Sequence, residues 1–121
     1  MKANIEQFED LKVWQDARRF VHDVYGISGE GPFAKDFGLR DQICRASVSI
    51  MSNIAEGFER ASRKDFVRFL DFSKASAAEV RSQLYIALDL GYIDEATFMT
   101  LRGDASSLSK QLAGFVRYLK Q

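Results

Sequence analysis

The chain has 121 residues, 46% of them hydrophobic and 28% charged, with 17 basic and 17 acidic side chains. This length is typical of one domain, and the zero formal net charge argues against nucleic-acid binding driven by charge over the whole surface. No apolar run approaches the roughly 18 residues needed to span a bilayer, and the N-terminus lacks the apolar stretch of a secretory signal. A single cysteine cannot form an internal disulfide. We therefore expect a single-domain, cytoplasmic protein (residues 1–121) without a membrane segment.

The first predicted helix is amphipathic. Its apolar residues recur at helical spacing and form one broad face: Val13, Trp14, Ala17, Phe20, Val21, Val24 and Ile27. Glycine and proline follow within residues 28–32, so we expect a loop there. The place of Trp14 on the apolar face favours core packing over a role as a stacking platform for a nucleotide base.

The second predicted helix, about residues 36–56, has two apolar sides. The core stripe comprises Leu39, Ile43, Ala46, Ile50 and Ile54, and the second stripe comprises Cys44, Val48, Met51 and Ala55. A helix with two apolar sides has more than one neighbour to pack against, so we assign the second stripe to an interface between subunits. For Cys44 itself, these apolar surroundings favour a small buried side chain over a reactive thiol.

The third predicted helix begins with a capping signal, because Ser62 can accept a backbone N–H and Asp65 stands three residues later. A seam with alternating steps of four and three then runs through Phe66, Leu70, Ser73, Ala77, Val80, Leu84, Ala87 and Gly91. Gly91 can end the helix in a left-handed conformation. Phe72 and Ile86 lie off this seam, so we add them to the interface.

Asp94 can cap a fourth helix. Its seam comprises Phe98, Leu101, Ala105, Leu108, Leu112, Phe115 and Leu119. Gly103 is a weak point, because glycine costs about 1 kcal/mol relative to alanine inside a helix. Short connections favour antiparallel neighbours, and the sequence therefore predicts an all-α fold: an antiparallel, up-down-up-down four-helix bundle.

Catalytic and metal-binding constellations do not emerge from the sequence. His22, the sole histidine, lies nearly opposite the core face of its helix, which favours a solvated side chain. A di-iron bundle needs Glu-x-x-His pairs, whereas Arg19 precedes His22 by three residues. One cysteine and one histidine cannot build a structural zinc site, and no glycine-rich phosphate loop occurs. We expect no enzyme activity, no metal and no cofactor.

Two sets of polar or charged residues still need an interpretation. The first lies on or beside the polar side of the second helix and comprises Arg45, Asn53 and Glu56, followed by Gly57. We expect these polar side chains to be clamps that reach another helix or subunit, rather than a ligand site. The second is the basic cluster Arg60, Arg63, Lys64 and Arg68. It is either a solvated helix end or a phosphate contact, and because cations oppose the dipole at a helix N-terminus, it has no obvious stabilising purpose.

Three stretches of the sequence form a pattern that is more specific than the apolar spacing of an ordinary helical bundle. They are Phe8-Glu9-Asp10-Leu11-Lys12-Val13-Trp14-Gln15, Gly38-Leu39 with Gln42 and Arg45-Ala46, and Ser49-Ile50 with Asn53-Ile54-Ala55-Glu56-Gly57. The pattern resembles that of the bacterial four-helix-bundle proteins linked to intervening sequences in 23S ribosomal RNA genes. Met51 departs from it, because many relatives carry proline there.

This resemblance implies a small cytoplasmic bundle that often forms a ring-like pentamer. Related bundle proteins are nucleic-acid-binding accessories of reverse transcriptases in retroelements, but those proteins tend to be basic. Two functions stay open: a homo-oligomeric assembly or scaffold protein, and an accessory protein that binds RNA or DNA.

Overall fold

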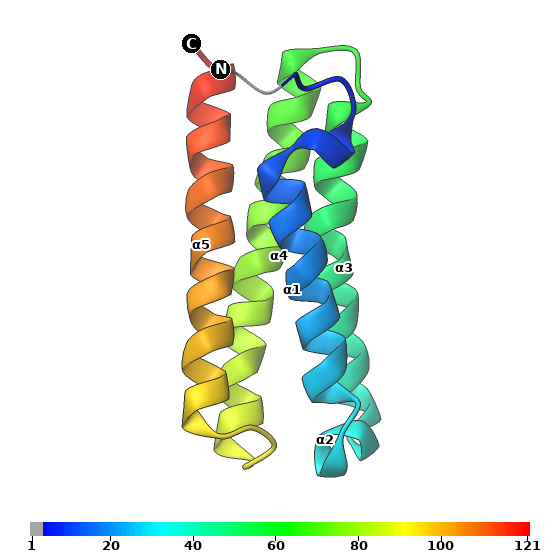
Figure 1. Ribbon diagram of the computed structural model, residues 1–121, viewed down its shortest axis with the longest axis vertical. Helices are drawn as coiled ribbons and strands as arrows, with labels where there is room; N and C mark the ends of the chain where they lie inside the picture. Colours follow the sequence, from blue (N-terminus) through cyan, green and yellow to red (C-terminus); the bar gives the residue numbers. More distant parts are fainter. Residues whose placement is uncertain (1–3) are drawn as a thin grey trace.

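The computed structural model describes residues 4–121, and the chain is all-α over that part, with no strand, as the sequence predicts. Its elements are a short 3-10 helix, η1 (Phe8–Asp10), and the helices α1 (Lys12–Ser28), α2 (Gly31–Lys35), α3 (Phe37–Phe58), α4 (Arg63–Asp89) and α5 (Glu95–Leu119). Four of these helices are long, and successive long helices run in opposite directions along the long axis of the molecule (Figure 1).

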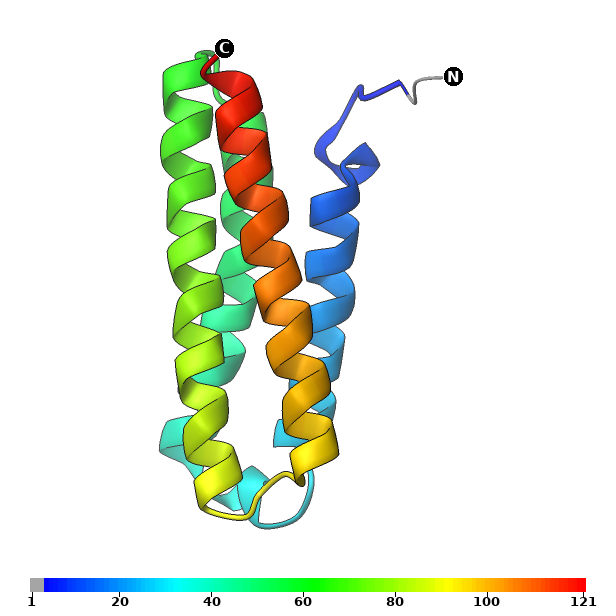
Figure 2. The same ribbon diagram turned by 90° about the vertical axis from the view of Figure 1, so that its left-hand side faces the viewer.

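The long helices pack side by side around a common core. α3 packs most extensively against α4, and α4 against α5, while α1 lies against α3 and, less extensively, against α5. The α1–α3 and α4–α5 connections lie at one end of the molecule, and the α3–α4 connection lies at the other end with the C-terminus (Figure 2).

Local sequence signals set the helix ends. The side chain of Ser62 accepts the Asp65 N–H at 3.1 Å, and that of Asp94 accepts the Thr97 N–H at 2.7 Å, so both predicted caps are confirmed. Gly91 follows α4 with φ +74°, the left-handed conformation that glycine adopts without strain. α5 continues through Gly103 without a break.

The loop predicted for residues 28–32 is only partly correct. The chain leaves α1 after Ser28 but begins the one-turn helix α2 at Gly31, with Pro32 in its first turn. Proline is tolerated there because the first N–H groups of a helix have no intrahelical acceptor. α2 places Phe33 in the core, where its ring stacks on Tyr92 at 5.2 Å between centroids.

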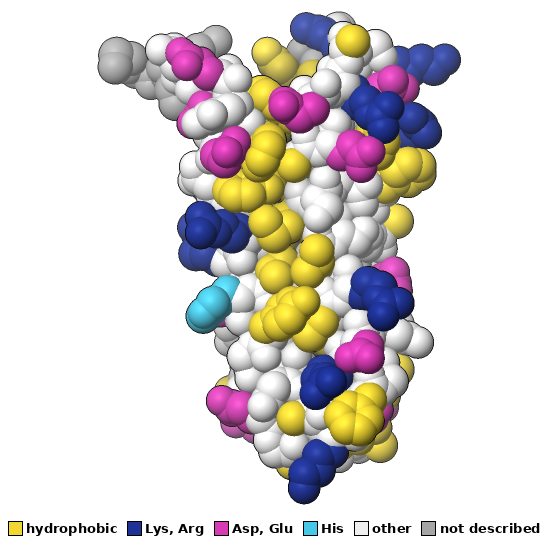
Figure 3. Space-filling view, turned by 90° about the vertical axis from the view of Figure 1, so that its right-hand side faces the viewer, with side chains coloured by type: hydrophobic (Ala, Val, Ile, Leu, Met, Phe, Trp, Pro, Cys, Tyr) yellow, Lys and Arg dark blue, Asp and Glu magenta, His cyan; other side chains and the backbone are white. Residues whose placement is uncertain are grey.

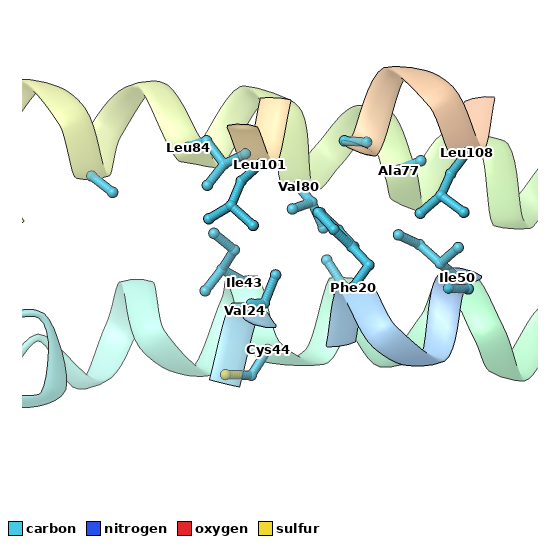
Figure 4. Packing of buried hydrophobic residues seen from close by; sticks show 14 of the residues in the cluster. Phe20, Val24, Ile43, Cys44, Ile50, Ala77, Val80, Leu84, Leu101 and Leu108 are labelled. Carbon is cyan, nitrogen blue, oxygen red and sulfur yellow. The ribbon is translucent and has the colours of Figure 1, made fainter. Parts of the chain in front are cut away.

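The core is built mainly from the predicted seams, with Phe33 and Cys44 added to them. Figure 4 shows side chains of α4 and α5 meeting those of α1 and α3 from opposite sides. The buried residues labelled there are Phe20, Val24, Ile43, Cys44, Ile50, Ala77, Val80, Leu84, Leu101 and Leu108. Burying large apolar side chains contributes about 1.5–3 kcal/mol each, so the seams account for the packing of the long helices.

Candidate functional site

The polar motif residues of α3 find their partners close by in sequence. Asn53 Nδ2 donates to the carbonyl oxygen of Ser49 at 2.8 Å and to its Oγ at 2.9 Å. Glu56 pairs with Arg60 at 3.0 Å, one turn further along the chain. Within this chain, Asn53 and Glu56 therefore do not bond directly to another long helix, because side chains four residues apart on a helix are already neighbours. A contact of either residue with another subunit stays a prediction. Arg45 is exposed, and no ion pair or hydrogen bond within residues 4–121 involves it.

Serine hydroxyls, which the sequence analysis missed, link α3 to α4. Ser73 Oγ donates to the carbonyl oxygen of Ile50 at 2.7 Å, and the hydroxyls of Ser49 and Ser76 lie 2.9 Å apart. The signal in the sequence is the run of small residues Ser73, Ser76 and Ala77 on one side of α4, which permits close helix approach. Asn53 is thus connected to α4 indirectly, through Ser49.

Two arginines of the basic cluster are stacked on phenylalanine rings. The guanidinium carbon of Arg60 lies 4.6 Å from the centroid of the Phe69 ring, and that of Arg68 lies 5.0 Å from the same centroid. Arg68 also lies over Phe72 at 5.8 Å and pairs with Asp65 at 3.6 Å. Stacking of this kind is worth about 0.5–1 kcal/mol at an exposed site.

The other two members of the basic cluster, Arg63 and Lys64, differ in their contacts. Arg63 Nη1 donates to the carbonyl oxygens of Leu119 at 3.4 Å and Gln121 at 3.5 Å, where a cation favourably meets the C-terminal end of α5. Lys64 is exposed and has no such contact within residues 4–121. The inference that the cluster lacks a stabilising purpose is therefore wrong for Arg60, Arg63 and Arg68, because tertiary packing brings acceptors and rings to them.

The second apolar stripe of α3 borders α1. Val48, Met51 and Ala55 are half-buried there, and an apolar band runs down the side of the molecule where α1 and α3 lie (Figure 3). Beside it, Trp14 is half-buried against the core and meets Phe8 edge to face at 5.2 Å, so the core-packing interpretation of Trp14 holds only in part.

Cys44 does not belong to this exposed band. It is only 8% exposed, and its Sγ lies 3.2 Å from Ser28 Oγ. Ser28 gives its own proton to the carbonyl oxygen of Val24 at 2.7 Å, so the Cys44 thiol must be the donor in this pair. Cys44 is a buried residue, as expected, but its assignment to the interface is corrected: α1 covers it.

The other predicted interface residues, Phe72 and Ile86, protrude from α4. Each side chain is 47% exposed, which is high for large apolar groups. They stand two heptads apart on one side of the helix. Aligned apolar side chains of this kind suggest an interaction surface.

A polar groove of about 450 Å³ between α1 and α5 had no signal in the sequence. Asp16 accepts from Lys12 at 2.6 Å, from Gln111 on α5 at 3.1 Å and from Arg19. Burial alone would raise the pKa of Asp16, but these hydrogen bonds and the cationic charges together lower it. Burial, followed by the charges of Asp23 and Asp16, raises the pKa of Asp104 across the groove.

The groove holds one histidine among its acidic and basic side chains. His22 lies at its edge with a side chain that is 90% exposed, as the sequence predicts. Within residues 4–121, no group of three or more histidine, cysteine or acidic side chains is placed to hold a metal ion. No helix in that part of the chain is both long and apolar enough to cross a membrane.

Comparison with protein families identifies the chain. The profile of the 23S rRNA-intervening sequence protein family matches residues 9–114. The chain belongs to this family. The match runs from η1 well into α5 and includes the motifs of α3, so the resemblance seen in the sequence is confirmed.

A solved structure shares the fold of this family member. It is a protein of unknown function from the S23 ribosomal protein family of Bacteroides thetaiotaomicron, with a TM-score of 0.79 and 24% sequence identity. The similarity covers 86% of this chain and 97% of that protein. No curated protein matches the chain significantly.

Proposed function

We propose that this family member is a homo-oligomeric assembly protein without catalytic activity, metal or cofactor. Its unit is one domain, an antiparallel up-down-up-down four-helix bundle that works in the cytoplasm. The exposed apolar faces of the bundle bind further copies of the chain. A pentamer is the subunit number that the family resemblance implies.

The observation that carries this proposal is the presence of two apolar surfaces on different elements. One is the apolar band that runs where α1 and α3 lie (Figure 3), and α3 carries the half-buried Val48, Met51 and Ala55. The other is the pair Phe72 and Ile86 on α4. Single exposed apolar side chains are ordinary, whereas aligned ones are typical of protein interfaces.

Light scattering coupled to size exclusion tests the proposal. We expect a mass that is a multiple of the 13.7 kDa chain over micromolar concentrations. A mass of one chain throughout this range would contradict it, since the apolar faces would then stay in contact with solvent.

A second candidate function, binding of RNA or DNA, is favoured by the basic cluster. Stacking holds Arg60 and Arg68 against Phe69 but leaves their side chains 42% and 54% exposed. Guanidinium groups held in place in this way can still donate to phosphate oxygens. The family name also refers to ribosomal RNA. Repetition of the cluster in an oligomer would add several weak contacts together.

Lys64 allows a clean test of this second function. Because Lys64 has no ion pair or hydrogen bond to lose and an acid is favoured in the first turn of a helix, Lys64→Glu should not lower stability, yet it should weaken binding of fluorescent single-stranded RNA. Binding should also fall steeply with salt, because counterion release drives association. Arg63→Glu is a less specific variant, since it also removes the contact with the end of α5. Absence of binding by the unmodified protein at low salt would reject this function and leave the assembly function in place.

A further inference from the structure

We propose that the face formed by α4 and α5 binds an acidic α-helix of a different protein. Six cations run along this face and define the α4–α5 stripe: Lys74 and Arg81 on α4, and Arg102, Lys110, Arg117 and Lys120 on α5. This partner site is separate from the apolar surfaces of the proposed assembly function and from the basic cluster within residues 60–68.

Two hydrogen bonds across the α4–α5 seam place the stripe. Arg81 Nη1 donates to Ser106 Oγ at 3.3 Å, and Arg102 Nε donates to the Tyr85 hydroxyl oxygen at 3.0 Å. α4 and α5 lie side by side and run in opposite directions (Figure 2). The two hydrogen bonds therefore fix which residues of the two helices lie level with each other.

Helix periodicity brings three more cations to the same face. Lys74 lies on the same side of α4 as Arg81, because residues seven apart recur after two turns. Lys110 stands four residues after Ser106 on α5 and is therefore its neighbour on the helix surface. Arg117 follows Lys110 after a further seven residues, so it extends the same side of α5.

Lys120 forms one end of the stripe. It lines a small pocket of about 230 Å³ together with Val67 of α4, which stands seven residues before Lys74. Val67 and Lys120 also lie level with each other in the register that the two hydrogen bonds set. The pocket thus supports this register independently.

The cations of the stripe follow one another at the spacing of helix turns. Their order along the bundle is Lys120, Arg117, Lys74, Lys110, Arg81 and Arg102. Each stands three or four residues of helix beyond the last, which is about 4.5–6 Å at a rise of 1.5 Å per residue. The stripe is therefore about 27 Å long and carries about one cation per turn.

No acid within residues 4–121 forms an ion pair with any cation of the stripe. Arg81 and Arg102 donate to hydroxyl oxygens, which leaves their positive charges unopposed. Asp71 borders the stripe on α4, whereas Asp104 faces the groove with α1. The face therefore carries an excess of positive charge that an acidic partner would complement.

The spacing of the cations favours a helix as the partner. A helix whose acids recur every three or four residues presents a carboxylate about every 5.4 Å along one side, so each acid meets one cation of the stripe. A strand of duplex DNA presents a charge about every 3.4 Å, which does not match this spacing.

The seam beneath the cations has small side chains. Ser106, Ser109 and Ala113 of α5 follow one another at helical spacing and are half-buried. Small side chains permit close approach, and a helix that lies in the groove between two others packs in an ordinary way. The shape of the face therefore agrees with its charge.

A synthetic peptide tests the proposal. The probe is a fluorescent helical peptide of about 20 residues, about 30 Å long, with a glutamate at every third or fourth position and alanine or glutamine elsewhere. A matched peptide has the same composition in an order that scatters the glutamates around the helix. Fluorescence anisotropy should show that the striped peptide binds at least about tenfold more tightly, and that added salt weakens its binding.

Lys74→Glu combined with Lys110→Glu reverses the charge at the centre of the stripe. Both side chains are exposed and make no ion pair or hydrogen bond within residues 4–121, so circular dichroism should show an intact fold. We expect the affinity for the striped peptide to fall at least about tenfold. Lys35→Glu combined with Arg45→Glu makes the same change in net charge at exposed positions on other elements and should retain the affinity. If the first variant unfolds, alanine replaces both lysines of the stripe.

Several outcomes would overturn the proposal. They are no binding of the striped peptide at low salt, equal affinity for the two peptides, and affinity that survives charge reversal of the stripe or falls equally in the control variant. Tighter binding of single-stranded RNA that is lost in the same variant would reassign the face to nucleic acid. A lower molecular mass of that variant would reassign it to contacts between copies of the chain. The mass of the unmodified protein tests the assembly function separately.

Discussion

Gly57 of α3 lies directly against Phe69 of α4. A Cβ atom built on Gly57 would stand 2.8 Å from the Phe69 Cβ and 2.9 Å from Cδ1 of Phe66. Real Cβ atoms essentially never approach so closely, and the Phe69 Cβ cannot move without its backbone. The glycine that ends the α3 motif is therefore a packing requirement where α3 and α4 meet.

Gly57→Ala should destabilise the protein. Overpacking costs about 1–3 kcal/mol, which exceeds the gain of about 1 kcal/mol that alanine brings to a helix. Gly103→Ala is the matched control, because nothing lies within 4 Å of a Cβ at that position of α5. It should stabilise the protein by up to about 1 kcal/mol. Urea denaturation measures both, and equal effects of the two substitutions would contradict the packing argument.

Replacing Asp16 by a neutral residue should lower the stability of the folded chain, whereas the same change at Asp104 should raise it. The pKa of Asp16 is lowered in the folded chain, so its contribution to stability is present above its ordinary pKa of 3.8 and is lost as pH falls through the folded value. Asp16→Asn should thus cost on the order of 1 kcal/mol at neutral pH, and the loss should vanish at strongly acidic pH.

Asp104→Asn should have the opposite effect to Asp16→Asn. The pKa of Asp104 is raised, so its ionised form destabilises the folded chain above that pKa. The substitution should raise the melting temperature at neutral pH, by a modest amount because Asp104 is only partly desolvated in the groove and water still screens its exposed side chain. Melting curves at neutral and acidic pH test both aspartates, and a loss of stability in both variants at neutral pH would contradict the assignment.

Tyr92 should lose its proton at a higher pH than an ordinary tyrosine. Its hydroxyl donates to Asp36 Oδ2 at 2.9 Å, and this hydrogen bond, then burial and the negative charge, raises its pKa above the ordinary 10.0. Its contribution to stability is complete below about pH 10 and is lost as pH rises through the folded pKa. The difference in phenolate absorbance between the unmodified protein and Tyr92→Phe isolates this group. A midpoint at or below its ordinary pKa would show that the hydrogen bond is absent in solution.

Cys44 should react slowly in the folded protein. The thiol is buried and donates to Ser28, whereas the reactive species is the exposed thiolate. A thiol reagent should therefore label it at least about tenfold faster in denaturant than in buffer, if labelling needs local opening. Equal rates in the two conditions would place the thiol at the surface.

The sequence by itself determined the four long helices and most of the core. The periodicities of α1, α3, α4 and α5 gave the buried seams, because an apolar stripe at helical spacing can be buried only on one side. Ser62, Gly91 and Asp94 gave the helix ends, since caps act over three or four residues. The family motifs around Asn53 and Gly57 were equally readable without coordinates.

Tertiary structure decided the contacts of those polar residues whose partners lie on other segments of the chain. The basic residues Arg60 and Arg63 owe their partners, the Phe69 ring and the end of α5, to chain segments that only folding brings near. Cys44 seemed to belong to an exposed stripe until α1 was seen to cover it. Spacing along one helix fixes the direction of a side chain, but the partner it meets depends on how neighbouring helices approach.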